Sequence, residues 1–297
     1  SLHDALPICY EDDPFGFVQG LTTGAERYMF YLTGGDGAGD NHLKNIVRLG
    51  GSASKLHLLL FLAAVNMDEQ ALTHLKALLE SMVYYSTVNQ IKTNELERLY
   101  AQWCKQIREI HTDEELTSFI NNKIKPTISQ WKVNNRSNFM RIGFDSMQQY
   151  RVKFILARIT KYVDVRRKNG GDASNVAEFY EGGIEIEHIM PQKYSAAYGI
   201  SEDDYNAAKQ RLGNLTLLEK TINASIGDDA FASKSEAYRQ SAYYLTRSIA
   251  QLDDVGQQTA INRMNQKLRS WSSWGPSMIE DRQAILYDLS EEIWSID

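Results

Sequence analysis

Cysteine is nearly absent from the 297-residue sequence, which contains only Cys9 and Cys104. Two cysteines cannot form a disulfide framework or a four-cysteine zinc site, so a reduced, cytoplasmic setting is expected. Long apolar runs are absent too. The longest, Leu56–Val65, is broken by His57 and is far shorter than the roughly 18–20 residues that cross a bilayer. No secretory signal is visible, and the chain does not start with Met. These absences argue against a secreted or membrane-spanning protein.

A nucleotide-binding loop is also missing from the N-terminal part. The glycine-rich stretch Gly34–Asp40 lacks the Gly-Lys-Ser/Thr ending of a phosphate-binding loop, and no apolar strand leads into it. The opening Ser1–Ile8 has neither helical nor strand periodicity and need not be native. Residues 1–40 are therefore predicted to be an irregular N-terminal segment.

Positive charge is scarce overall, because 32 Lys and Arg residues face 38 Asp and Glu residues, which gives a formal net charge of −6. It is concentrated in residues 123–168, which contain twelve basic and only two acidic residues. That segment carries +10 and the rest of the chain −16. Such asymmetry favours a surface that faces phosphate groups, although a solvated helix face would have the same composition.

Apolar residues recur at helical spacing through most of the chain, beginning with residues 41–125. Thr112, with Glu115 three residues later, has the form of a capping box, and the helix that it starts is predicted to end before Pro126. A basic amphipathic helix is predicted over residues 147–165. The sequence thus indicates a mainly α fold.

Two short strands are predicted near the centre of the chain. Ile184–His188 alternates with a period of two after a Gly-Gly stop and is ended by Pro191. Leu212–Leu218 is a second short apolar strand, and helical character returns after Thr221. The predicted order is therefore strand, loop, strand, helix.

The residues in and around these strands form a recognisable motif. The first part is Glu187–Gln192 (EHIMPQ), the second is Arg211–Leu218 (RLGNLTLL), and Asn223 lies nine residues after Asn214. Together they resemble the His–Asn–Asn variant of the HNH nuclease motif, in which a strand–strand–helix unit surrounds one divalent metal. A Glu-His-x-x-Pro sequence alone is common, so the specificity lies in its combination with the second part.

The surrounding pattern is similar to a narrower family. It includes Phe231-x-x-Lys234, Tyr238-x-x-Ser241, Arg282-x-x-x-Leu286 and Ile293-Trp294. Over roughly residues 146–297 the sequence resembles the C-terminal nuclease domain of GmrSD-type restriction enzymes, which cut modified or otherwise marked foreign DNA. The nucleotide-dependent N-terminal module of such proteins has no counterpart here, so the resemblance implies that this module belongs to a missing part or a partner.

The resemblance implies a helical domain over residues 41–145, followed by an α-rich nuclease domain over residues 146–297 with a small ββα-metal (HNH) core. It also implies a metal-dependent endonuclease that nicks or cleaves double-stranded DNA, as part of a restriction or anti-phage defence protein. No membrane partner is expected.

The chemistry of phosphodiester hydrolysis suggests a role for each motif residue. His188 is the candidate general base, because a neutral imidazole can deprotonate water near pH 7. Glu187 and the amide oxygen of Asn223 are candidate ligands of a divalent metal, with Mg²⁺ favoured and Mn²⁺ also acceptable. Asn214 is expected to hold the His188 ring or to brace the loop. Strict strand alternation would place Glu187 and His188 on opposite faces, so both reach one metal only if the strand twists or ends there.

DNA contacts are predicted from the basic helix and from one lysine beyond the motif. Arg151, Arg158 and Lys161 are spaced seven and three residues apart, which places them near one another on a helix. Lys234 is a candidate for contact with a DNA phosphate, although a solvated lysine would fit the sequence nearly as well. Two other functions stay open at this point: a DNA-binding or regulatory module with a degenerate nuclease site, and a helical scaffold for protein interaction.

Overall fold

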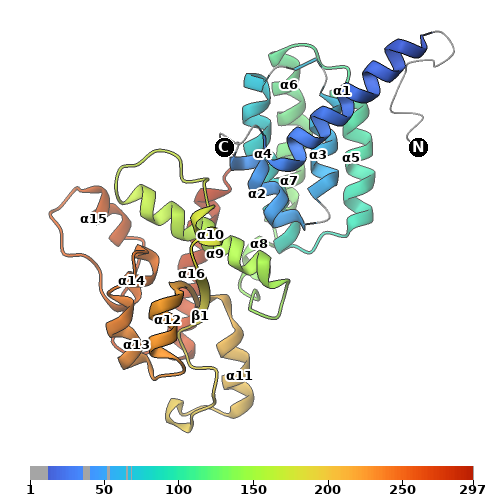
Figure 1. Cartoon of the computed structure of the whole chain (residues 1–297). Coiled ribbons are helices and arrows are strands. Elements are labelled where there is room, and N and C mark those ends of the chain that lie inside the picture. The colour runs from blue at the N-terminus through green and yellow to red at the C-terminus, as the bar shows by residue number, and fades with distance from the viewer. Residues whose placement is uncertain (1–12, 36–40, 52–53, 65, 68, 297) are drawn as a thin grey trace. The chain divides into compact units, whose positions relative to one another are not determined.

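The computed structural model describes residues 13–35, 41–51, 54–64, 66–67 and 69–296 (Figure 1). The chain start Ser1–Ile8, Cys9 and the end of the glycine-rich loop lie outside the described residues. The prediction of an irregular segment over residues 1–40 is wrong for Pro14–Thr33, which form a helix that Asp13 caps through its side chain. The chain divides into two compact units, residues 1–80 with 91–124 and residues 81–90 with 125–297. Both are built mainly from helices, which confirms the predicted mainly α fold. None of the described helices is long and apolar enough to cross a membrane.

The first unit consists of helices packed around an apolar centre. Its elements are α1 (Pro14–Thr33), α2 (Asn41–Gly50), α3 (Ser54–Ala63), the first part of α4 (Glu69–Val88), α5 (Thr93–Ile107), α6 (Asp113–Phe119) and a π-helical turn (Ile120–Ile124). Helix α3 packs against α1, α2 and α5, and its Leu58, Leu60 and Phe61 are fully buried. Within this core, His57 is hydrogen-bonded to the Tyr100 hydroxyl, and burial lowers the pKa of His57 to about 3.

The predicted capping box at Thr112 is confirmed, and the helix that it starts, α6, ends before Pro126 as predicted, although another helix follows without a loop. The Thr112 side chain accepts from the backbone of Glu115, and the Glu115 carboxylate accepts from the backbone of Thr112. The chain stays helical through the π-helical turn and directly enters α7 (Lys125–Lys132). Pro126 is tolerated because it lies in the first turn of α7, where a backbone N–H has no partner within the helix.

The second unit holds both strands. Its elements in chain order are α7, α8 (Asn135–Phe139), α9 (Gln149–Arg166), α10 (Glu178–Glu181), β1 (Ile184–His188), a 3₁₀ turn (Ala196–Tyr198), α11 (Glu202–Gln210), a 3₁₀ turn (Leu212–Asn214), β2 (Leu215–Glu219), α12 (Lys220–Ile226), α13 (Phe231–Tyr238), α14 (Tyr244–Ala250), α15 (Ala260–Asn265) and α16 (Pro276–Ile293). The predicted bounds of β1 are confirmed. Strand β2 begins three residues later than predicted, because Leu212–Asn214 forms the 3₁₀ turn.

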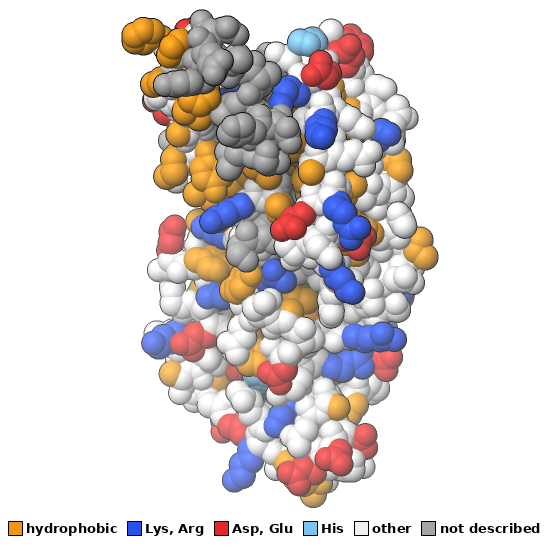
Figure 2. Space-filling view, turned by 90° about the vertical axis from the view of Figure 1, so that its right-hand side faces the viewer, with side chains coloured by type: hydrophobic (Ala, Val, Ile, Leu, Met, Phe, Trp, Pro, Cys, Tyr) orange, Lys and Arg blue, Asp and Glu red, His pale blue; other side chains and the backbone are white. Residues whose placement is uncertain are grey.

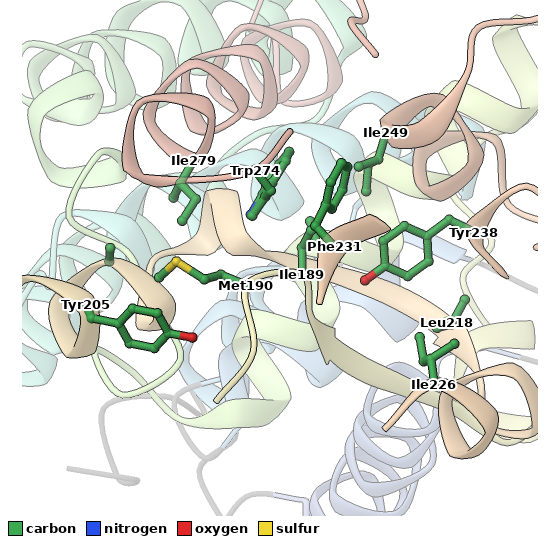
Figure 3. Close-up of a cluster of buried hydrophobic side chains, with 11 residues drawn as sticks. Ile189, Met190, Tyr205, Leu218, Ile226, Phe231, Tyr238, Ile249, Trp274 and Ile279 are labelled. Carbon is green, nitrogen blue, oxygen red and sulfur yellow. The ribbon is translucent and has the colours of Figure 1, made fainter. Parts of the chain in front are cut away.

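The two strands form an antiparallel pair in which Ile184 faces Glu219 and His188 faces Leu215. Helix α12 follows β2 without a loop and packs against both strands. A cluster of buried apolar side chains lies beside the pair (Figure 3). Figure 3 shows Leu218 of β2 next to Ile226 of α12, with Phe231 and Tyr238 of α13 close by. Full burial of such a side chain contributes roughly 1.5–3 kcal/mol, so this cluster fixes α12 and α13 against the strands.

Candidate functional site

His188 occupies the last position of β1 and is only 4% exposed. Its ring packs edge-on against Phe144, with the ring centroids 5.0 Å apart. Phe144 is itself fixed, because its N–H donates to the carbonyl oxygen of Gln210 at 2.6 Å. The Nε2 atom of His188 and the Oε1 atom of Gln210 are both buried and make no hydrogen bond. The ring is therefore held by packing, and its Nε2 is a buried nitrogen atom without a hydrogen-bond partner.

The environment of His188 keeps its imidazole neutral. Burial is the main cause that lowers its pKa, from 6.5 to about 4, and the positive charge of Lys234 acts in the same direction. The amide of Gln210 acts against them. At pH 7 the ring is therefore an acceptor of protons, as a general base must be.

Asn214 braces the loop that follows His188. Its Oδ1 accepts from the backbone N–H of Met190 at 2.7 Å and from Nε1 of Trp274 at 2.9 Å. Its Nδ2 donates to the carbonyl oxygens of Met190 at 3.3 Å and Lys209 at 2.8 Å. The side chain is fully buried, so its amide is occupied by the protein itself. This geometry agrees with a bracing role rather than with direct contact to a substrate.

Helix α16 clamps the turn that carries Asn214. Nη1 of Arg282 donates to the carbonyl oxygens of Gly213 at 2.8 Å and Leu215 at 2.7 Å, and Oε1 of Gln283 accepts from the N–H of Gly213 at 3.2 Å. A Cβ atom on Gly213 would lie 2.0 Å from the carbonyl oxygen of Ile279, so only glycine fits between this turn and α16.

Glu187 is buried in an ion pair instead of facing an open site. Its Oε1 accepts from Nζ of Lys234 at 2.7 Å and from the Tyr238 hydroxyl at 2.9 Å. The same Nζ donates to the carbonyl oxygen of His188 at 2.7 Å. Desolvation raises the pKa of Glu187, and the positive charge of Lys234 opposes that shift. With Lys234 already balancing its charge, Glu187 is poorly placed to bind a metal.

Strand alternation separates the polar side chains of β1 into two groups. Glu185 and Glu187 leave one face, on the side of Lys234, whereas His188 leaves the other face, towards Phe144. Asn223 of α12 joins the first group, since its Nδ2 donates to Oε2 of Glu185 at 2.9 Å. The structure thus brings Asn223 to Glu185, and not to Glu187 or His188. A single ion touching both His188 and Asn223 does not fit this arrangement.

Two of the four predicted DNA contacts are buried. Lys234 is 1% exposed and Arg158 is 5% exposed. Nη1 of Arg158 donates to the carbonyl oxygen of Ala173 at 2.7 Å, and its guanidinium lies over the ring of Trp294. Both side chains support the interior, because their polar atoms point to partners within the protein. Their positive charge suggested contacts with DNA phosphates, but in the folded chain both side chains are buried.

The other two predicted DNA contacts lie nearer the surface. Lys161 is in an ion pair with Glu178 at 3.2 Å, and Nε of Arg151 donates to the hydroxyl of Tyr150 at 3.1 Å. On the face drawn in Figure 2, Lys and Arg side chains are scattered among Asp and Glu side chains. The charge of segment 123–168 is therefore partly neutralised by residues from elsewhere in the chain.

Sequence reasoning missed several residues that shape the site. Trp274, Arg282 and Gln283 support Asn214 and Gly213 from about 60–70 residues further along the chain. The Arg282-x-x-x-Leu286 pattern pointed to that region in the sequence, but it did not indicate which residues Arg282 would contact. Among the described residues, no group of three or more His, Cys, Asp or Glu side chains could hold a metal ion. The Glu185–Asn223 pair offers one carboxylate and one amide instead.

The comparison with protein families agrees with this arrangement of strands, turn and helices. A family model described as "GmrSD restriction endonucleases, C-terminal domain" matches residues 131–289, which is more than half of the chain. The matched range contains both strands, His188, Asn214 and Asn223. A comparison with curated proteins finds no match. The chain belongs to the family of GmrSD restriction endonucleases and carries their C-terminal domain.

Proposed function

We propose that this chain hydrolyses phosphodiester bonds of foreign or modified DNA, with His188 as the general base. The observation that supports this most strongly is a neutral, rigidly held imidazole with an unengaged Nε2 at the end of β1, within a restriction endonuclease domain. Nε2 would take a proton from the attacking water. Lys234 binds the carbonyl oxygen of His188 and Asn214 binds the N–H of Met190, so the backbone that carries the base is already ordered before the reaction.

The order β1, β2, α12 supports an HNH-type core. Helix α12 begins directly after β2 and packs on both strands, as a ββα unit requires. Asn214 lies in the turn before β2 and Asn223 lies on α12, in the order of a His–Asn–Asn motif. The unit carries the proposed base at the end of one strand and an oxygen donor on the helix.

A divalent metal, Mg²⁺ or Mn²⁺, fits Glu185 and Asn223 better than Glu187. Their carboxylate and amide oxygens are ligands that a hard cation prefers, and both side chains are partly exposed. Lys220 reaches Glu185 only at 4.0 Å and is itself 70% exposed, so it can move aside. When bound, such an ion would neutralise negative charge on a DNA phosphate that lies on this face of β1, opposite the face that His188 leaves. Glu187 is assigned instead to fixing Lys234 and the end of β1.

A plasmid-nicking assay tests the proposal. His188→Ala should lower the nicking rate by about 10²–10⁴-fold, because a positioned general base contributes that much. Removal of Mg²⁺, or the Glu185→Gln/Asn223→Ala double variant, should also lower the rate, whereas Glu187→Gln should act mainly through stability. Glu236→Gln, which removes an exposed carboxylate, is the matched control.

Three outcomes would contradict the proposal in different ways. Nicking by His188→Ala at the parent rate would remove His188 from the chemistry. Retention of DNA without cleavage by the parent protein would indicate a binding module. Neither binding nor cleavage would favour a protein-interaction scaffold.

A further inference from the structure

A hollow of about 360 Å³ in the second unit is lined by three basic side chains. The basic residues are Arg166 at the end of α9, Arg263 on α15 and Lys267 just beyond α15. Tyr162 and Asn169 also line the hollow. The lining contains no carboxylate. We call it the α9–α15 hollow. Its lining differs from the surroundings of Lys161 and Arg167 on the same helix region, each of which pairs with a carboxylate.

Arg263 is held in place without losing its charge. Nη1 donates to the carbonyl oxygen of Gln258 at 2.9 Å, and Nη2 donates to Oδ1 of Asn169 at 3.1 Å. Both acceptors are neutral. Within the described parts of the chain, Arg263 has no carboxylate at ion-pair distance. The guanidinium is therefore oriented in advance, while its charge is left uncompensated.

Arg166 brings a second uncompensated charge to the same hollow. Its guanidinium lies over the ring of Tyr162, 5.3 Å from the centroid, and it forms no ion pair with any residue that the structure describes. Lys267 is different, because Glu292 neutralises it and also accepts from the Tyr162 hydroxyl at 2.7 Å. The net positive charge of the hollow thus comes from the two arginines.

Neighbouring arginines show that acidic partners are available in this region. Arg167, next to Arg166, pairs with Asp253 at 2.9 Å, and Arg247 approaches the same carboxylate at 3.9 Å. Arg166 and Arg263 line one hollow without such a partner, and two like charges at one site repel each other unless an anion lies between them. Planar guanidinium groups suit phosphate, because each can donate two hydrogen bonds to it.

We propose that the α9–α15 hollow binds a phosphate of the DNA backbone, at a distance from the bond that is cut. This rests on the proposed function, because it assumes that DNA is the substrate. Helix α9 begins five residues after Phe144, which contacts His188, and ends at Arg166. Its 18 residues span about 26 Å at 1.5 Å per residue. Helix α11 ends at Gln210, whose amide lies near His188. Figure 1 shows α11 and α15 on opposite sides of the second unit.

That span corresponds to about eight nucleotide steps of 3.4 Å along one strand. The hollow would therefore anchor duplex DNA well outside the cleaved step and lengthen the footprint of the enzyme. Since it contacts only the backbone, it should act on all sequences alike.

The test is binding of a labelled 30-base-pair duplex across a salt series. Each phosphate contact contributes about 0.9 to the slope of log K against log salt. Arg166→Gln/Arg263→Gln should thus remove the one phosphate contact and flatten the slope by about 0.9, so that a fourfold rise in salt costs the parent about 3.5-fold more affinity than the variant. The control is Arg239→Gln/Arg269→Gln, which removes two exposed arginines that are already paired with Glu236 and Asp281. Arg166→Gln alone should flatten the slope by up to about 0.9, and it guards against misfolding of the double variant.

Other measurements separate this inference from the proposed function. The double variant should need a higher DNA concentration than the parent for half-maximal nicking, because the hollow binds the substrate. An unchanged salt slope in a variant that still nicks DNA would overturn the hollow as a DNA site and leave His188 in its role. Binding of inorganic phosphate that depends on both arginines, together with an unchanged DNA slope, would mark a small-anion site and equally overturn it. A parent protein that neither binds nor nicks DNA would overturn both proposals.

Discussion

Replacement of Lys234 by methionine should destabilise the second unit far more than it weakens DNA binding. Nζ of Lys234 makes two hydrogen bonds of 2.7 Å, to the carboxylate of Glu187 and to the carbonyl oxygen of His188. The side chains of Lys234 and Glu187 are only 1% and 7% exposed. Lys234→Met would leave Glu187 buried without a counter-charge. Loss of one partner of a buried ion pair costs about 3–5 kcal/mol.

Thermal and denaturant unfolding would measure this loss. For a unit of this size, about 3–5 kcal/mol corresponds to a fall of roughly 6–20 °C in Tm. Adding Glu187→Gln should recover part of the loss, because it removes the unpaired charge and keeps an Oε1 acceptor for Tyr238. The double variant should therefore be more stable than Lys234→Met alone. Lys220→Met, at a lysine side chain that is 70% exposed, should change stability by less than about 0.5 kcal/mol.

One result would refute this reasoning. If Lys234→Met unfolds within about 1 kcal/mol of the parent while the salt slope of DNA binding falls by about 0.9, Lys234 contacts a DNA phosphate. The ion pair with Glu187 would then contribute little to the folded state.

Two further predictions concern the proposed base and its support. Asn214→Ala should lower the free energy of unfolding by about 2–5 kcal/mol and also lower the nicking rate, because Met190, Lys209 and Trp274 lose their hydrogen-bond partner. Chemical denaturation measures the first effect and plasmid nicking the second. A variant as stable as the parent would show that these hydrogen bonds are dispensable. Since burial lowers the pKa of His188 to about 4, nicking should be lost only as the pH falls towards 4 and not near 6.5. Over the same interval the free energy of unfolding should fall by about 3 kcal/mol on account of His188, because the unfolded chain binds a proton there that the folded chain does not. Buried His57 adds a slope to both proteins, so unfolding across pH 4–7 should show a steeper slope in the parent than in His188→Gln, and equal slopes would contradict the assignment.

Local sequence signals predicted the elements that carry the site. The alternation in Ile184–His188 defined β1 correctly, because its pattern reflects burial on the two faces of a strand. The same alternation anticipated that Glu187 and His188 would leave opposite faces. The signal at Pro126 is also local, since a proline is suited to the first turn of a helix and α7 begins at Lys125.

Long-range partners explain what the sequence did not reveal. Lys234 looked like a surface lysine because its partner Glu187 lies 47 positions away in the sequence. Arg158 added to the charge of a basic segment, yet it is buried against Ala173 and Trp294. A sum of charges along the chain cannot distinguish an arginine that satisfies a buried carbonyl group from one that faces solvent. The same distance hid the link between Asn223 and Glu185.

The clamp of α16 on the Asn214 turn has a consequence for the timing of biosynthesis. His188 leaves the ribosome 94 residues before Arg282, and Trp274 and Gln283 also come late. At roughly 5–20 residues per second, this interval lasts about 5–19 seconds. A nascent chain that has emerged only as far as Asn214 still lacks Trp274, Arg282 and Gln283, which bind the turn in the folded protein. The turn that carries Asn214 is therefore completed only after α16 has emerged, long after His188 itself.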